Sequence, residues 1–160
     1  MNMAQADAAI ANQKWKYTYN FWRPVTAIRW PDDGNPNTAS DPIWRPLLNT
    51  PPYPDFPSAL SVLTGAATSV LREFFGTDDI AFSATVTVGS LPLPAPLDPL
   101  APKTITRSYT SLSQAASEAQ MSRVYAGLHY REACTAGGLH GTKIGRLVVR
   151  TELRPVRGKN

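Results

Sequence analysis

The sequence is poor in cysteine, in charged residues and in long hydrophobic runs. Its single cysteine, Cys134, cannot form an internal disulfide, so a disulfide framework is excluded. No apolar run approaches the roughly eighteen residues of a transmembrane helix, and residues 1–11 lack the basic and then apolar segments of a signal peptide. Charged residues make up only 18% of the chain and aromatic residues reach 9%, which is unlike an intrinsically disordered chain. We therefore expect a soluble, folded protein with no membrane partner and no assigned compartment.

The residues that are present indicate one globular domain. A chain of 160 residues with 42% apolar residues is long enough to bury a sizeable core. Its fifteen prolines gather mainly in residues 31–56 and 89–102 and follow no period, which excludes a collagen, a coiled coil and a repeat array. We expect residues 1–160 to form a single domain.

The net charge of +4 is concentrated near the C-terminus. Residues 1–129 carry nine basic and ten acidic residues, whereas residues 130–160 carry seven basic and two acidic ones. Such a basic segment could bind nucleic acid, but a solvated helix face followed by a frayed end is the simpler interpretation. We therefore predict no nucleic-acid partner. The last five basic residues of the chain are Arg146, Arg150, Arg154, Arg157 and Lys159.

Hydrophobic spacing and helix-breaking residues predict an all-α fold. Helices are expected over residues 4–21, 58–76, 111–131 and 135–153, although four glycines weaken the prediction for the last one. A further helical turn is predicted over residues 25–30 and an extended segment over residues 80–88. The loop over residues 31–56 is rich in apolar residues, which is more typical of a functional covering segment than of a tether.

The first of three notable motifs is Lys16-x6-Arg23-Pro24. On a continuous helix, seven residues are close to two turns, so Lys16 and Arg23 would project from the same face. Two neighbouring cations repel each other unless an anion lies between them. The motif therefore favours an anion site, with two separate surface charges as the alternative.

Two further motifs place donors and a histidine near helix ends. Ser58 begins a predicted helix and is followed by the small Ala59, and free backbone N–H groups at such a start favour a bound oxyanion. In Ser122-Arg123-x5-His129, the last two residues would lie about 240° apart on one helix, so they converge only if the long Arg123 side chain curls round. The alternatives are a simple capping serine, a structural ion-pair arginine and an ordinary histidine.

Together the motifs resemble Lys-x6-Arg-Pro, Pro-Ser-Gly-His and Ser-Arg-x5-His-x3-Asp, the signature of the vanadium-dependent haloperoxidase and type 2 phosphatidic acid phosphatase superfamily. Residues 16–29, 33–36, 50–58 and 107–115 are similar to its soluble bacterial haloperoxidase-like branch. The resemblance implies a helical bundle with a pocket for vanadate or, in phosphatases, a phosphoryl group.

The resemblance also implies a role for each motif residue. Lys16, Arg23 and Arg123 would neutralise the oxyanion, and Ser58 and the Ala59 backbone would add hydrogen bonds. His129 would be the catalytic residue, as the axial ligand of vanadium or as the nucleophile of a phosphatase. Vanadate is the implied cofactor, with phosphate as the other occupant, and the implied substrates are peroxide and halide.

The sequence departs from the family pattern at three positions. Leu60 stands where the family has its acid–base histidine, Ala59 replaces the glycine before it, and Ala133 replaces the aspartate after the ligand histidine, for which Glu132 is a nearby substitute. Loss of an acid–base group typically lowers a rate by 10²–10⁴-fold. We therefore expect an impaired haloperoxidase; the alternatives are a phosphatase that takes a phosphorylated small molecule, with His129 as nucleophile, and a non-catalytic oxyanion-binding remnant.

Three further expectations follow from the resemblance. Tyr53, seven residues before Leu60, lies where halide selectivity could be set. Relatives have a longer helical region before the lysine motif, so the chain is expected to correspond to the C-terminal half of a larger bundle. Apolar faces left exposed by missing helices would favour a homo-oligomer.

Overall fold

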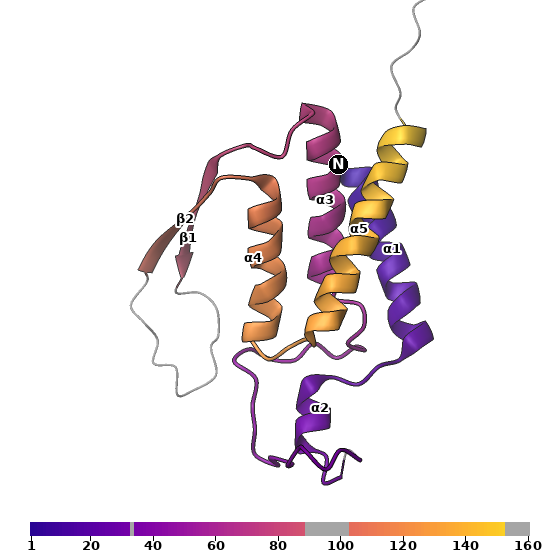
Figure 1. Cartoon of the computed structure of the whole chain (residues 1–160), viewed down its shortest axis with the longest axis vertical. Coiled ribbons are helices and arrows are strands. Elements are labelled where there is room, and N and C mark those ends of the chain that lie inside the picture. Colours follow the sequence, from indigo (N-terminus) through magenta and orange to yellow (C-terminus); the bar gives the residue numbers. More distant parts are fainter. Residues whose placement is uncertain (33, 89–102, 153–160) are drawn as a thin grey trace, which may run out of the picture.

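A computed structural model describes residues 1–32, 34–88 and 103–152. The helices in this part of the chain are α1 (Asn2–Tyr19), α2 (Pro24–Arg29), α3 (Ala59–Phe75), α4 (Leu112–Tyr125) and α5 (Arg131–Thr151). Two antiparallel strands, β1 (Phe82–Val88) and β2 (Lys103–Tyr109), form a hairpin beside α4 (Figure 1). The predicted all-α class is confirmed, because the hairpin is only an appendage to the helices. None of the described helices is long and apolar enough to cross a membrane.

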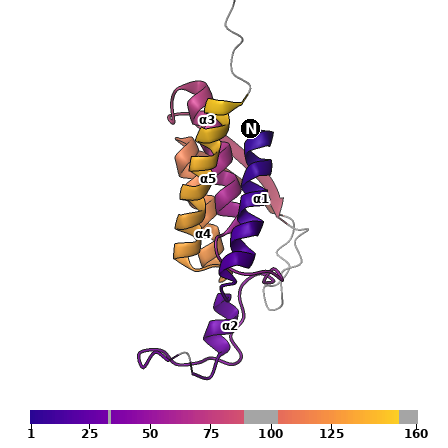
Figure 2. The same cartoon turned by 90° about the vertical axis from the view of Figure 1, so that its right-hand side faces the viewer.

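The four long helices form an up-and-down bundle. α1 and α4 run toward the end of the bundle where α2 and the long loop lie, and α3 and α5 start from that end (Figures 1 and 2). α3 and α5 are both central, since each contacts α1 and α4 and the two contact each other. This alternation brings the C-terminal ends of α1 and α4 together with the N-terminal ends of α3 and α5.

The bundle core is a close seam between α3 and α5, the most extensive contact between helices. Gly137, Gly141 and Gly145 recur every fourth residue of α5 and are all buried. A Cβ at Gly145 would lie 2.5 Å from the Ala66 carbonyl oxygen, and one at Gly141 would collide with backbone atoms of α3. The glycines that weakened the prediction of this helix therefore allow it to pack, and the helix starts four residues earlier than predicted.

The structure corrects the helical geometry predicted for the first motif. α1 ends at Tyr19, and Asn20 has φ 45° in the left-handed region. Arg23 is the N-cap of α2 instead of a residue of α1. Asn20 tolerates this conformation better than most residues because its short polar side chain can bond locally. Lys16 and Arg23 are thus brought together by a turn of the chain and not by a shared helix face.

The predicted helix over residues 111–131 also ends early. α4 stops at Tyr125, and Gly127 has φ +70°. His129 therefore lies in the short connection between α4 and α5, and the expected angle of 240° between Arg123 and His129 does not apply. The extended segment predicted over residues 80–88 contains β1, which begins at Phe82, whereas β2 was not predicted. The predicted loop over residues 89–102 lies outside the described residues.

Candidate functional site

The structure places the predicted site residues at one end of the bundle. Lys16 is in the last turn of α1, Arg123 in the last turn of α4, and Ser58 is the N-cap of α3. Arg23 and His129 lie in the adjoining connections, 5% and 4% exposed respectively, and Lys16 and Ser58 are fully buried. The antiparallel order of the helices is what brings segments more than 100 residues apart to one place.

The charged side chains of the site shift one another's pKa values. Burial and then the neighbouring Arg23 lower the pKa of Lys16 to about 8. The pKa of Arg23 is also lowered, mainly by burial; the nearby Asp55 opposes this shift, and Arg123 adds a smaller lowering effect. The pKa of His129 is lowered, chiefly by burial, against the opposing effect of Asp55, and this favours a neutral imidazole at pH 7. The site thus gathers cations that repel one another around a neutral histidine.

The loop before α3 holds Lys16 and Arg23 through its carbonyl groups. The Lys16 Nζ donates to the carbonyl oxygens of Pro54 at 2.7 Å and Asp55 at 3.0 Å. Arg23 Nε donates to the Tyr53 carbonyl at 3.0 Å, and Arg23 Nη1 donates to that of Leu128 at 2.8 Å. Both cations also lie about 5 Å from the centre of the Tyr53 ring. The covering role predicted for this loop therefore includes fixing the positions of two charges.

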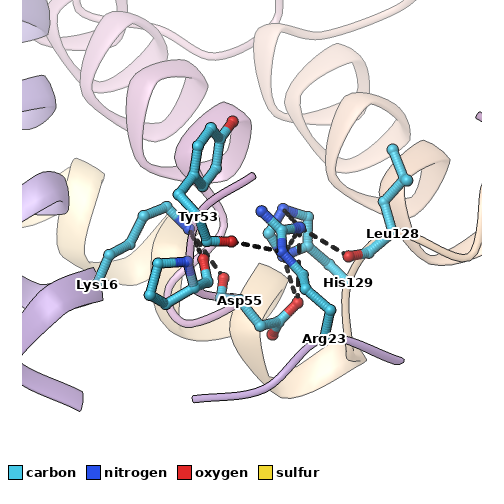
Figure 3. A network of polar contacts seen from close by, with 7 residues as sticks. Lys16, Arg23, Tyr53, Asp55, Leu128 and His129 are labelled. Atoms are coloured by element: carbon cyan, nitrogen blue, oxygen red, sulfur yellow. Dashed lines mark hydrogen bonds and ion pairs between the residues drawn. The ribbon is translucent and has the colours of Figure 1, made fainter. Parts of the chain in front are cut away.

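Asp55 is a site residue that the sequence interpretation missed. Its side chain is fully buried, and its Oδ1 lies 2.8 Å from His129 Nδ1 and 3.8 Å from Arg23 Nη1 (Figure 3). Glu132, proposed from the sequence as the partner of the imidazole, is exposed, and it is Asp55 that makes the contact. The available signal was an acidic residue between Pro54 and Phe56, in an otherwise apolar segment directly before Ser58.

Several buried donors at this end of the bundle have no acceptor. Arg23 Nη2, Ser58 Oγ and Arg123 Nε are buried without a hydrogen-bond partner. Ser58 makes no capping bond to α3, and the first N–H groups of a helix, here beginning at Ala59, lack intrahelical acceptors. Buried polar groups are normally paired. Guanidinium, hydroxyl and free backbone N–H groups are donors that suit a tetrahedral oxyanion, so the chemistry of this donor set fits such a ligand.

The residues that the structure describes contain no group of three or more histidine, cysteine, aspartate or glutamate side chains suited to a metal cation. The cations and hydrogen-bond donors of the site instead suit an anion. The residues of the site therefore suit vanadium in the form of the anion vanadate and do not suit a free metal cation.

Two of the three altered family positions, Leu60 and Ala133, lie close to this set. Leu60, in the first turn of α3, is 37% exposed, and Ala133, near the start of α5, is buried. Neither side chain can carry a proton.

A pocket of about 470 Å³ opens beside Asp55 and Ala133, and its walls include the rings of Phe21, Trp22 and Tyr130. Solvent can thus approach the site from the side on which these rings lie.

Comparisons with known proteins give consistent matches. A family model described as the VCPO second helical-bundle domain matches residues 1–158. The vanadium chloroperoxidase of Curvularia inaequalis is 30% identical over 164 residues, covering 82% of this chain and 26% of that protein.

Solved structures agree with this match. The crystal structure of the first bacterial vanadium-dependent iodoperoxidase superposes with a TM-score of 0.69 at 37% identity, covering 92% of this chain and 31% of that one. An apo-type bacterial vanadium-dependent chloroperoxidase gives a TM-score of 0.74 at 21% identity, covering 92% and 34%, and this likeness shows the fold alone. The chain spans between a quarter and about a third of the length of these relatives.

Proposed function

We propose, from the premise that this chain belongs to the vanadium haloperoxidase superfamily, that it binds vanadate at the converging helix ends and supports the oxidation of halide by peroxide. The observation that carries this proposal is the set of buried donors without acceptors: Arg23 Nη2, Ser58 Oγ and Arg123 Nε. An anion held there would complete their hydrogen bonds and offset the repulsion between the cations.

Each residue has a defined part in holding the anion. The charges of Lys16, Arg23 and Arg123 would balance the negative charge of vanadate or phosphate, and preorganised donors of this kind stabilise an anion without further reorganisation. Ser58 and the Ala59 N–H would add hydrogen bonds. When bound, vanadate supplies the Lewis acid that activates peroxide toward halide.

His129 would be suited to hold vanadium through one ring nitrogen. Burial lowers its pKa, and the neutral ring that results has a lone pair on one nitrogen. The same neutral ring could attack a phosphoryl group, so the phosphatase alternative uses the same residue. Halide oxidation and phosphate hydrolysis would both require the anion to bind among the three cations first.

Leu60 limits what the site can do with protons. In the family pattern an acid–base histidine occupies this position, and Leu60 cannot donate or accept a proton. We propose that turnover is weak for this reason, with a deficit within the 10²–10⁴-fold range that loss of an acid–base group typically produces.

A titration with vanadate, followed by ⁵¹V nuclear magnetic resonance, tests the proposal. We expect saturable binding that phosphate competes away, and halide oxidation by peroxide only when vanadate is present. Hydrolysis of an aryl phosphate that vanadate inhibits would instead support a phosphatase. Binding without either reaction would indicate a non-catalytic oxyanion protein, and absence of binding by the folded chain would contradict the proposal.

The variant Leu60→His tests the proton deficit. It restores a proton carrier at the first turn of α3, so we expect halide oxidation to rise by at least 10-fold. Leu60→Asn is the matched control, because it introduces polarity but no group that titrates. An equal rate in the two variants, both folded and both loaded with vanadate, would contradict the role assigned to position 60.

A further inference from the structure

We propose that Asp55 is a positioning residue for His129: it accepts the Nδ1 proton of the imidazole and thereby directs Nε2 toward the anion. This inference rests on the proposed function, because the benefit of fixing the ring lies in presenting one nitrogen to vanadate. It assigns to the loop before α3 a task that the family pattern gives to an aspartate at the position of Ala133.

The contact between the two side chains is short and buried. Asp55 Oδ1 lies 2.8 Å from His129 Nδ1, and the two side chains are 0% and 3% exposed. Neither Asp55 oxygen has a directed hydrogen bond in this structure. The nearest donor to this carboxylate is the Nδ1–H of His129, and the contact between them is short but not linear.

The backbone of Asp55 holds this carboxylate in place from two sides. Its N–H donates to the Phe21 carbonyl at 2.9 Å, and its own carbonyl accepts from the Lys16 ammonium group at 3.0 Å. Both bonds cross to segments more than 30 residues away. The carboxylate is thus tied to the same framework that positions the cations, as an orienting group needs to be.

The surrounding charges select one tautomer. An ionised carboxylate can only accept, so the nitrogen that faces it carries the proton. Arg23 Nη1 lies 3.1 Å from His129 Nε2 and 3.4 Å from Nδ1, and a guanidinium can only donate. A second proton on Nε2 would face this cation. Asp55 and Arg23 therefore both favour the tautomer in which Nδ1 is protonated and Nε2 is not.

Neighbouring residues on α5 cannot take this role. Ala133 has no polar side chain, and Glu132 is exposed where it lines the pocket beside the site. The orienting carboxylate has thus moved from the helix after the histidine to a loop more than 70 residues before it. Asp55 and His129 meet only because α3 and α5 start at the same end of the bundle.

Nitrogen chemical shifts of His129 in the full chain without vanadate test this inference independently of the proposed function. At pH 7.5 we expect a protonated Nδ1 and a bare Nε2. Free imidazole side chains favour the opposite tautomer in water, so Asp55→Ala should shift His129 toward protonated Nε2. Glu132→Gln is the matched control and should leave the shifts unchanged. Protonated Nε2 in the wild-type chain, or unchanged shifts in folded Asp55→Ala, would overturn the inference.

Anion affinity gives a second readout with the isosteric Asp55→Asn, which preserves side-chain volume. Loss of a partner that orients a ligand typically weakens metal affinity by 10–100-fold, so vanadate should bind at least 10-fold less tightly. Phosphate, which needs the cations but not the imidazole lone pair, should bind as tightly or more tightly because one buried negative charge is gone. Equal weakening for both anions would contradict the positioning role. Failure of the wild-type chain to bind vanadate would contradict the proposed function and leave the tautomer result to stand alone.

Discussion

At the scale of single residues, two N-cap serines show how similar positions can serve different purposes. Ser111 accepts a hydrogen bond from the Gln114 N–H and caps α4. Ser58 leaves α3 without a side-chain cap, and its hydroxyl has no well-formed hydrogen bond and interacts with the Cys134 thiol. The first arrangement stabilises a helix. The second makes a donor available for a ligand.

Alanine substitutions should separate these purposes. Ser111→Ala should lower the free energy of unfolding by about 1 kcal/mol and leave phosphate affinity unchanged. Ser58→Ala should leave the free energy of unfolding nearly unchanged, because it removes a buried hydroxyl without a well-formed hydrogen bond, and should weaken phosphate binding by about 3–10-fold. Urea unfolding and phosphate titration measure the two effects. A large stability loss in Ser58→Ala with intact affinity would identify it as a structural serine.

The buried Lys16 should make stability depend on pH. Its pKa is about 8 in the folded chain against 10.5 for an unperturbed lysine, so between these values the unfolded state binds more protons than the folded state. The free energy of unfolding therefore rises with pH across this window. Below about pH 8 the lysine is charged in both states, and its burial penalty is fully present.

Comparison of the wild-type chain with Lys16→Met, in a buffer free of oxyanions, isolates this effect. The wild-type chain should gain stability relative to the variant as the pH rises from about 8 to 10.5. Urea unfolding at several pH values provides the measurement. Parallel pH profiles for the two proteins would show that Lys16 keeps an ordinary pKa in the fold.

Motif spacing predicted the gathered cations and histidine, but it could not predict Asp55. The motifs have a fixed spacing, so each of their residues can be identified from the sequence alone. These residues are Lys16, Arg23, Arg123 and His129. Asp55 is one acidic residue in a proline-rich loop, and its partner lies 74 positions further along the chain. Only the tertiary fold brings them together, since no local periodicity relates a loop residue to a distant helix connection.

At the scale of the elements, the α3–α5 seam depends on the absence of side chains. Gly141→Ala would place a Cβ against the Val62 carbonyl and the Ala66 backbone N–H, and these backbone atoms cannot move cheaply. Overpacking typically costs about 1–3 kcal/mol, and we expect a loss at the upper end of this range despite the better helix propensity of alanine. Thermal and urea unfolding would show it.

Thr135→Ala is the control for this substitution, because Thr135 lies on the exposed side of the same helix. It should change the free energy of unfolding by no more than about 0.5 kcal/mol. Similar stabilities for Gly141→Ala and Thr135→Ala would mean that the two helices are further apart than the structure shows.

The positions of the helices were predictable, whereas several of their ends were not. Apolar spacing predicted α3 and α4, and a helical composition without glycine or proline predicted α1. α5 was also predicted, but α4 was extended through Gly127 to residue 131. The left-handed conformation of Gly127 accompanies the approach of the Trp44 ring to within 2.8 Å of where its Cβ would be. The contact of Gly127 with Trp44, 83 positions away, thus coincides with the end of the helix. The hydrophobic periodicity of the sequence cannot predict such a long-range contact.

At the scale of the whole molecule, apolar side chains remain exposed on the end of the bundle opposite the site. Phe74 is 79% exposed and Met1 53%, and both line a pocket of about 480 Å³ together with Val70 and Val148. Exposed apolar patches often mark contact surfaces. The homo-oligomer expected from the sequence remains a prediction, and this patch is where we expect two copies to meet.

Sedimentation velocity can check this prediction. Phe74→Ser should weaken self-association by about 10-fold or more, because burial of a phenylalanine contributes about 1.5–3 kcal/mol and a symmetric contact would use it twice. Ile43→Ser is the control, since Ile43 is 84% exposed in the loop at the other end. A monomer at all concentrations, or equal weakening by both variants, would contradict a contact through this patch.

The exposure of Leu60 also has a consequence for how the chain would exchange protons with its surroundings. Water reaches the place from which the missing histidine would act, because more than a third of this side chain is open to solvent. Dissolved weak acids and bases can therefore come to that place as diffusing proton carriers. The rate of any turnover by this chain would depend on the chemical identity and concentration of the buffer. Two buffers at the same pH would therefore give different rates.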